Sequence, residues 1–307
     1  MLKEEVVIVR RIVLLALLVV ALASCGVERA VAPREPAPAA EVERTAAAFE
    51  AVTSAVVEAW NSGDVDAVRE LYTDDIVHHD TSFGAHIEGI DAVVRMASSF
   101  MAQYAGMQSR VADWLIGSDY ILDVWELRNI TLGGYEFTQD DPLVEVDLLE
   151  TRGDRISYWT LYYGLDTLEK VGWSGVPLDK ARSLLSSYGL AWSSGDPRIV
   201  GDLYAGDAVR EDAIFGERAE GRGAISSFAE SFFAWYPGAQ WKLLLPFGDG
   251  RHHAPVVGGV FAIEVSGPSG ERCEVHAAVL LKTSEDQIVH EALYYGADSL
   301  ISCGWAR

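Results

Sequence analysis

Histidine and aspartate stand together in the run His78-His79-Asp80, and these residue types can bind a metal ion or transfer a proton. The run closes an apolar stretch that is predicted to form a strand. Because neighbouring residues of a strand point to opposite faces, only His78 and Asp80 can act on the same side. No further histidine lies at the spacing of a metal ligand. We therefore expect no metal at this position.

The aspartate at position 80 has a counterpart, Asp212, because the chain repeats itself. Across residues 59–106, 22 of the 48 residues are identical to those found 132 positions later, without a gap. The run Ala-Trp-x-Ser-Gly-Asp, for example, contains Trp60 in the first copy and Trp192 in the second. A repeat of this length is the signature of a duplicated domain. We therefore expect two tandem domains.

Each repeat is predicted to begin with helices and to end with strands. In the first repeat, apolar residues spaced three or four apart predict a helix that ends at Gly63, and Asp64 is suited to cap a second helix. A strand is expected at Ile76–Asp80 and a third helix at Asp91–Tyr104. Four further strands are expected at Ser109–Ile116, Tyr120–Ile130, Leu143–Glu150 and Ile156–Tyr163. Helices followed by antiparallel strands predict an α+β fold.

Composition excludes several classes of function. Half of the 307 residues are hydrophobic, which is enough for two globular cores, and we place these at 44–170 and 171–307. The formal net charge of −22 argues against a nucleic-acid partner, because nucleic acid favours a basic surface. The sequence contains no glycine-rich phosphate loop, nucleophile elbow or cofactor fingerprint, so we expect no cofactor.

Residues 1–24 are expected to be an export signal. Arg10 and Arg11 precede eleven apolar residues, Ile12–Leu22, which are too few to span a bilayer but typical of a secretory signal. The run Leu22-Ala23-Ser24-Cys25 resembles the bacterial lipobox, which implies cleavage before Cys25 and lipidation of that cysteine. The alternative is an ordinary signal followed by an unrelated cysteine. Lipidation would anchor the exported protein to the outer face of a bacterial membrane.

An extended tether is expected after the signal, in residues 25–43. Three prolines in this stretch disfavour a helix. Two further cysteines, Cys273 and Cys303, occur near the end of the chain. In an exported protein such a pair forms either a disulfide or two inert thiols, and the sequence leaves both possibilities open.

The two repeats resemble a known family. A run of Gly-Asp, Leu-Tyr, Asp-x-Val-x-x-Asp, Phe-Gly and Glu-Gly stands at Gly63–Gly89 and again at Gly195–Gly221. It is similar to the SnoaL-like polyketide cyclases and ketosteroid isomerases of the nuclear-transport-factor-2-like superfamily. The resemblance implies two cone-shaped domains, in each of which three helices close over a curved, mostly antiparallel sheet around an apolar pocket. It implies no single function, because this fold carries both enzymes and binding proteins.

The resemblance also implies roles for four residues. In the isomerases of this superfamily, an aspartate removes a proton beside a carbonyl, while a tyrosine and a protonated aspartate hold the resulting oxyanion. The base position matches Asp80 in the first repeat and Asp212 in the second. The tyrosine matches Tyr188 of the second repeat, and the protonated acid matches Asp147 of the first. Neither repeat therefore holds all three groups.

Further residues are expected to face the pockets. Alternation along the last strand places Glu291 inward, where it is either a catalytic acid or the ion-pair partner of Arg210. The side chains expected to contact a ligand are Trp60, His78, Trp159 and Tyr163 in the first repeat, and Trp192 and Tyr295 in the second.

The first pocket is expected to hold the more perturbed carboxyl group. Asp80 and Asp147 would share this pocket with only His78 as a nearby cation, so one acid should titrate well above its ordinary pKa. In the second repeat, Arg210 should keep Asp212 ionised.

Three functions follow from these expectations. The leading one is a surface-anchored protein that binds a small, largely apolar molecule in SnoaL-like pockets. The alternative is a cofactor-free cyclase or isomerase, which would act on a carbonyl-containing polyketide-like or steroid-like substrate by general acid and base catalysis. The third is an interaction module whose pockets are filled by their own aromatic side chains. In each case the two domains should pack sheet to sheet within a monomer.

Overall fold

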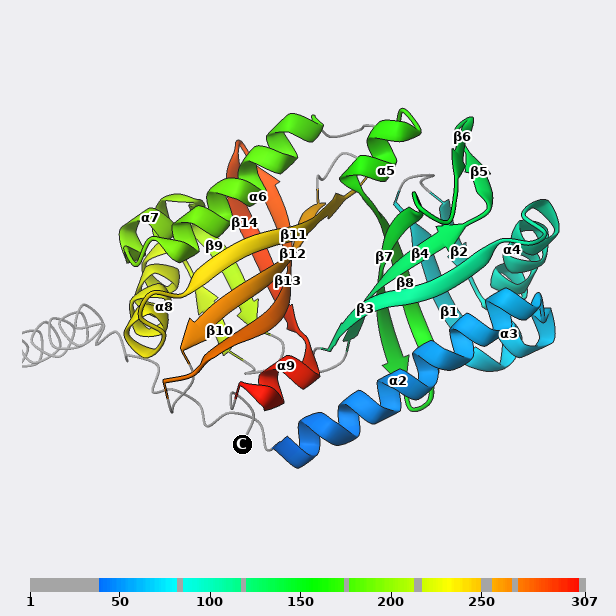
Figure 1. Cartoon of the computed structure of the whole chain (residues 1–307), viewed down its shortest axis with the longest axis horizontal. Coiled ribbons are helices and arrows are strands. Elements are labelled where there is room, and N and C mark those ends of the chain that lie inside the picture. Colours follow the sequence, from blue (N-terminus) through cyan, green and yellow to red (C-terminus); the bar gives the residue numbers. More distant parts are fainter. Residues whose placement is uncertain are drawn as a thin grey trace, which may run out of the picture. The chain divides into compact units, whose positions relative to one another are not determined.

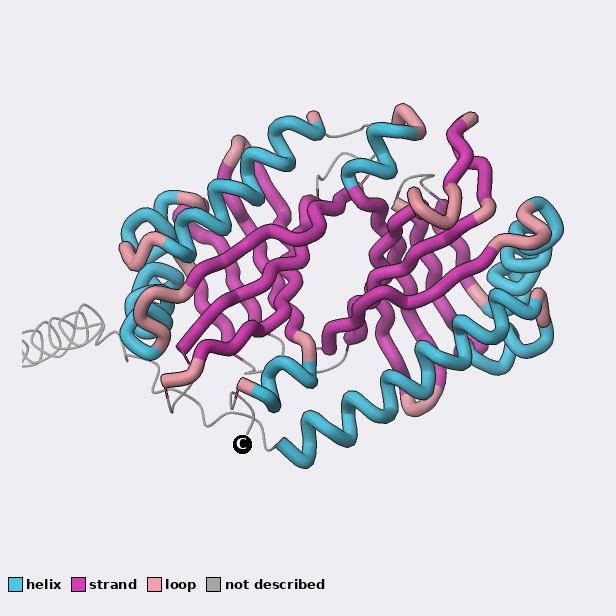
Figure 2. Tube along the Cα trace, viewed as in Figure 1, coloured by secondary structure: helices cyan, strands magenta, loops and turns pink. Residues whose placement is uncertain are grey.

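The computed structural model describes residues 39–81, 85–116, 120–173, 177–212, 217–249, 256–266 and 270–303, which form a mixed α+β fold (Figures 1 and 2). Eight helices and a large, mostly antiparallel sheet are present among these residues. The expected export signal, Cys25 and most of the tether lie outside the described residues, as do the two Phe-Gly turns. No helix in the described ranges is long and apolar enough to cross a membrane.

The elements of the first half follow the expected order of helices and then strands. They are α2 (Ala39–Ser62), α3 (Val65–Leu71), β1 (Tyr72–Asp80), β2 (Ala85–Glu88), α4 (Ile90–Gln103), β3 (Gln108–Ile116), β4 (Tyr120–Arg128), β5 (Ile130–Leu132), β6 (Tyr135–Phe137), β7 (Leu143–Arg152), β8 (Arg155–Gly164) and α5 (Leu165–Lys170).

The second half repeats this order without a counterpart of the small β5–β6 hairpin among its described residues. Its elements are α6 (Leu178–Ser193), α7 (Pro197–Asp202), β9 (Tyr204–Asp212), β10 (Glu217–Glu220), α8 (Arg222–Trp235), β11 (Gln240–Gly248), β12 (Val256–Ser266), β13 (Arg272–Ser284), β14 (Gln287–Tyr295) and α9 (Ala297–Ser302).

Helix ends in both halves are set by the same residue types. Gly63 has a φ of 71°, which glycine adopts easily, and Asp64 then caps α3 by accepting hydrogen bonds from the backbone of Asp66 and Ala67. Asp196 caps α7 in the same way. The prediction that the extended tether continues to residue 43 is wrong, because α2 begins at Ala39. That residue directly follows the last of the three prolines and opens a stretch rich in alanine and glutamate, which favour a helix.

Strand pairing is also the same in the two halves. Strands β3, β4, β7 and β8 are antiparallel neighbours, and β1 adds to β8 in parallel. Strands β11, β12, β13 and β14 are likewise antiparallel, and β9 adds to β14 in parallel. Helices α2, α3 and α4 pack near β1 and β3, whereas α6 packs on β11 and β12 and α8 on β9 and β10.

The first strand, β1, begins at Tyr72, which is four residues before the start predicted from the sequence.

The two halves are joined through the faces of their sheets that point away from the helices. Strand β8 pairs with β11 at Gly164 and Phe247. Side chains from both halves form one apolar cluster, whose buried members are Leu115, Leu122, Val124, Val146, Leu148 and Tyr162 from the first half and Phe247, Val260, Ala278, Leu280 and Tyr294 from the second. These residues alternate along the strands with the residues of the opposite face.

One further long-range link lies near the end of the described chain. Cys273 of β13 and Cys303 form a disulfide, with their Cα atoms 5.6 Å apart. The sequence left this pairing open. The bond ties the residue that follows α9 to the large sheet.

Candidate functional site

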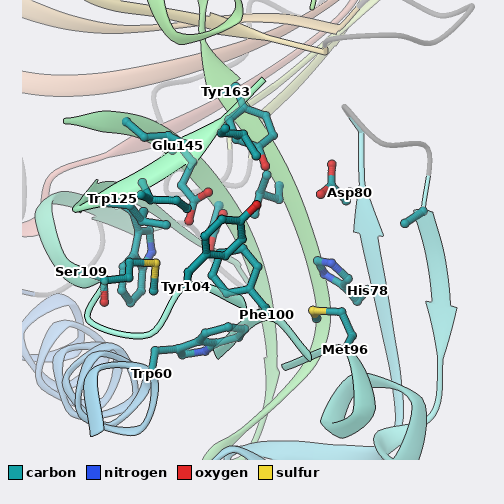
Figure 3. Close-up of a pocket in the computed structure, with 18 of the residues that line it drawn as sticks. Trp60, His78, Asp80, Met96, Phe100, Tyr104, Ser109, Trp125, Glu145 and Tyr163 are labelled. Carbon is teal, nitrogen blue, oxygen red and sulfur yellow. The ribbon is translucent and has the colours of Figure 1, made fainter. Parts of the chain in front are cut away.

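A cavity of about 560 Å³ lies in the first half, between the sheet and helices α2 and α4 (Figure 3). Most of its wall is aromatic or aliphatic. Its polar side chains include His78, Asp80, Glu145 and Asp147, and its aromatic residues are Trp60, Phe100, Tyr104, Trp125, Trp159, Tyr163 and Trp173. Six of the residues that were predicted from the sequence to face a pocket line this cavity. They are Trp60, His78, Asp80, Asp147, Trp159 and Tyr163.

Strand register explains why the acids converge. Asp123 of β4 pairs with Asp147 of β7, Asp147 pairs with Leu161 of β8, and Leu161 pairs with Asp80 of β1. Two positions along the strands, Trp125, Glu145 and Tyr163 form another such row in the same order. Residues two apart on a strand share a face, so both rows point to the same side of the sheet. Figure 3 shows Asp80 and His78 on one side of the cavity, and Glu145 and Trp125 on the other.

Two acids of this wall, Asp123 and Glu145, were missed by sequence reasoning. Both are buried, and Glu145 lines the cavity while Asp123 lies beside it in the sheet. A signal was present, because Asp123-x-Trp125 and Glu145-x-Asp147 each place two residues on one strand face. The sequence could not show which strands are neighbours, so it could not join the two pairs.

Burial dominates the electrostatics of the acids. It raises the pKa of Asp123 to about 7 and the pKa of Glu145 to about 8. Burial, followed by the nearby carboxyl groups of Glu145 and Asp123, raises the pKa of Asp147 well above its ordinary range. No lysine, arginine or histidine in the described part of the chain forms an ion pair with these three acids. Near neutral pH the wall therefore shares protons among its carboxyl groups.

His78 does not supply a positive charge to these acids near neutral pH. Its ring lies against Trp159, with the ring centroids 4.1 Å apart, and only 3% of its surface is exposed. Burial, with a smaller contribution from His79, lowers the pKa of His78 to about 4. The expectation that His78 is a cation beside Asp80 and Asp147 is therefore wrong. An imidazole that is surrounded by apolar groups is held neutral at pH 7.

The second half holds a different set of side chains on the same framework. Its row corresponding to Asp123, Asp147, Leu161 and Asp80 is Gly259, Val279, Leu293 and Asp212. The place of Glu145 is taken by Ala277, that of His78 by Arg210 and that of Trp159 by Glu291. The second half therefore lacks the acidic wall that Asp123, Glu145 and Asp147 form in the first half, and it contains an arginine in place of His78.

Arg210 compensates the two acids of the second half. Its guanidinium lies 3.4 Å from Glu291 and 3.8 Å from Asp212. The hydroxyl of Tyr188 donates a hydrogen bond to Glu291 at 2.7 Å, Tyr204 also donates to Glu291, and Tyr295 donates to Asp212 at 2.8 Å. Of the two alternatives for Glu291, the structure shows the ion pair with Arg210. Tyr188 points its hydroxyl at this buried carboxylate.

Aromatic side chains fill the space around this network. Trp192 is fully buried, and its ring contacts Tyr188, Phe232 and Trp241 at centroid distances of 6.1, 5.6 and 5.6 Å. The guanidinium of Arg210 lies 4.0 Å from the ring centre of Phe228. Trp192 and Tyr295, which were expected to contact a ligand, are therefore packed against protein groups.

A metal site is not indicated by the geometry. In the part of the chain that the structure describes, no group of three or more histidine, cysteine, aspartate or glutamate side chains is arranged to hold an ion.

Comparison with known families finds one match, which lies in the first half of the chain. A family model described as a SnoaL-like domain matches residues 53–159, so this part of the chain contains a SnoaL-like domain. No curated protein matches the chain.

Three of the solved structures that are similar to part of this chain are the following. A hypothetical protein with a ketosteroid isomerase-like fold from Catenulispora acidiphila, in complex with trimethylamine, is 20% identical, with 40% of this chain and 93% of that chain covered and a TM-score of 0.34. IdmH of Streptomyces antibioticus, a proposed polyketide cyclase, is 14% identical, with coverages of 40% and 96% and a TM-score of 0.34. A proposed SnoaL-like polyketide cyclase of Shewanella putrefaciens is 14% identical, with coverages of 40% and 84% and a TM-score of 0.35.

Proposed function

We propose that this chain is a membrane-anchored, extracytoplasmic protein that binds a small, largely apolar molecule in its first half. The cavity of about 560 Å³ is the observation that carries the proposal. Small-molecule sites are typically clefts of roughly 300–1,000 Å³ with apolar walls and a few polar groups. The aromatic wall and the acids that stand in one region of it fit this description. The SnoaL-like match over residues 53–159 supports the same assignment.

The proposal includes two SnoaL-like domains, at 44–170 and 171–307, with different roles. The sequence repeat and the recurring order of elements support it. In the second domain, Arg210 and the aromatic rings around Trp192 occupy the corresponding interior, which favours a structural role. The apolar cluster shared by the two halves favours a monomer in which the second domain takes the place of a dimer partner.

Export and lipidation at Cys25 are also part of the proposal. They rest on the basic start, the apolar run and Leu22-Ala23-Ser24-Cys25. Intact-mass analysis of the membrane fraction should find a chain that begins at a lipidated Cys25. An unmodified chain beginning at Met1 would remove this part of the proposal.

Ligand binding is tested by native mass spectrometry of the protein released from membranes. We expect a bound small molecule in the wild-type protein. Met96 of α4 lines the cavity, so Met96→Trp should fill part of it and reduce the bound fraction. Ala102→Trp, on an exposed position of the same helix, is the matched control and should retain the ligand. Equal loss of ligand in both variants, or no ligand in the wild type, would contradict the proposal.

A second candidate, a cofactor-free cyclase or isomerase, is favoured by one observation. Asp80 lies across the cavity from Glu145, whose raised pKa keeps a carboxylic acid protonated near neutral pH (Figure 3). A carboxylate base opposite a neutral acid can move a proton beside a carbonyl and stabilise the oxyanion. Isomerisation of a β,γ-unsaturated ketone, followed by ultraviolet absorbance, tests this. Asp80→Asn should then abolish turnover and Asp212→Asn should spare most of it; no turnover by the wild type would exclude this chemistry.

A further inference from the structure

The acidic wall of the first-half cavity contains buried oxygen atoms that lack a partner. Asp147 lines the cavity, only 4% of its surface is exposed, and its Oδ1 has no hydrogen-bond partner among the described residues. Behind it, both carboxyl oxygens of the fully buried Asp123 are in the same condition. The indole N–H groups of Trp125 and Trp159 offset part of the rise in the pKa values of Asp123 and Asp147, but they make no hydrogen bond to these carboxyl groups. Buried polar groups are normally hydrogen-bonded, so a carboxyl group that lines a cavity without one indicates a partner from outside the chain.

The second half shows what the same framework does when its acids are balanced. There, Asp212 and Glu291 share Arg210, and three tyrosine hydroxyls donate to them. The first half has more acids on its wall and no arginine at the corresponding place, which is held by the neutral His78. A positive charge that belongs to the protein in the second half is therefore missing from the first.

Aromatic rings surround the space in front of the acids. Trp60 contacts Trp159 and Phe100 edge to face, at centroid distances of 5.8 and 5.7 Å, and all three rings line the cavity. Trp125 and Tyr163 stand in the same cross-strand row as Glu145. The faces of such rings attract a cation, and this attraction grows when water is excluded.

We propose that the ligand of this cavity is a lipophilic ammonium ion, whose charged nitrogen lies at Glu145 and Asp147 and whose apolar body fills the aromatic part. This inference rests on the proposed function and names the chemical class of its ligand. For Glu145 and Asp147, the cation would be the counter-charge that Arg210 is for Glu291 and Asp212 in the second half. It would supply the charge that the acids lack, and the rings would replace its water of hydration.

Binding of such a cation is coupled to release of a proton. Near neutral pH the acids hold protons, so one carboxyl group must ionise, and its proton passes to the buffer. The titratable groups facing the wall from the neighbouring elements are Tyr72, His78, Asp80, Tyr104, Asp123 and Tyr163. Burial raises the pKa values of Tyr72 and Tyr163 and lowers the pKa of His78 to about 4, so these three stay neutral between about pH 6 and about pH 8.

The test uses isothermal titration calorimetry of the full mature protein with two probes of the same shape. Benzyltrimethylammonium carries a permanent charge and no proton of its own, and neopentylbenzene is its neutral carbon isostere. Titrations in two buffers with different heats of ionisation report the number of protons released. We expect the cation to bind about tenfold or more tightly than the isostere, with proton release and with an affinity that increases from about pH 6 to about pH 8.

The possible results of this titration distinguish failure of the cation inference from failure of the proposed function. Equal or tighter binding of the neutral isostere, without proton release, would overturn the cation and leave an apolar binding site standing. Binding of neither probe would count against both. In variants, Glu145→Gln and Asp147→Asn should each weaken cation binding about tenfold and leave isostere binding unchanged. Glu150→Gln, the same change on the opposite face of β7, is the matched control and should bind both probes like the wild type.

Discussion

His78 packs against the indole of Trp159, and the two corresponding positions of the second half hold Arg210 and Glu291, which form an ion pair. One strand contact is thus apolar in the first half and ionic in the second. The exchange changes the charge balance of the interior while the strand register stays the same.

The acids of the first half should make the protein less stable as the pH rises. A carboxyl group whose folded-state pKa is raised stabilises the folded state fully only below its unfolded pKa, and this stability is lost as the pH passes through the folded value. With the pKa of Asp123 at about 7 and that of Glu145 at about 8, the free energy of unfolding should fall between about pH 5 and about pH 8. Urea denaturation at a series of pH values measures this.

Asp123→Asn should flatten this pH dependence, because an amide cannot ionise. The variant should be more stable than the wild type near pH 8, by up to a few kcal/mol, since each unit of pKa shift corresponds to about 1.4 kcal/mol. Asp207→Asn changes an exposed aspartate of β9 and should keep the wild-type profile. An unchanged profile for Asp123→Asn would show that this carboxyl is not perturbed.

His78 should act in the opposite direction at acidic pH. Its pKa is lowered to about 4, so the stability due to the neutral ring is present above the unfolded value, about 6.5, and is lost as the pH falls toward 4. His78→Gln should therefore reduce the loss of stability between about pH 6.5 and about pH 4. His86→Gln, at an exposed position of β2, is the control. A proton-binding pKa near 6.5 for His78, measured by NMR, would contradict the buried, neutral ring.

Arg210→Met should destabilise the second half strongly. Removing the arginine leaves Glu291 buried without its ion-pair partner and takes one partner from Asp212, and the loss of one member of a buried pair typically costs about 3–5 kcal/mol. Arg198→Met breaks an exposed ion pair with Asp196 and should cost less than about 1 kcal/mol. Denaturant titrations of the two variants give the comparison, and similar small losses in both would mean that the buried network contributes little.

The disulfide should stabilise the folded chain. It closes a loop of 30 residues between Cys273 and Cys303, for which restriction of the unfolded chain corresponds to about 3–4 kcal/mol. The double variant Cys273→Ser, Cys303→Ser should unfold at a lower urea concentration than the oxidised wild type. Reduced wild-type protein should match the variant. Insensitivity of the wild type to reductant would rule out a stabilising bond.

Sequence patterns were sufficient for the order of the longer helices and strands. Helix and strand identity depends on local periodicity and on residues such as Gly63 and Asp64, which act on their immediate neighbours. Strand β2, the small β5–β6 hairpin and helix α5 were missed, as was the early start of β1, because short elements carry weak local signals. The start of α2 was missed for a similar reason, since the influence of the prolines ends at Pro38.

The sequence by itself determined the internal repeat, the α+β order of the longer elements, and the presence of acids and aromatic residues in both repeats. Only the tertiary structure decided that Asp123 and Glu145 stand beside Asp147, that His78 is neutral, and that Glu291 is paired with Arg210. Helices and turns can be predicted from local residue patterns, and a repeat can be found by comparing the sequence with itself. Strand neighbours and burial arise from contacts between residues far apart in the chain, and burial decides which carboxyl and imidazole groups keep their charge.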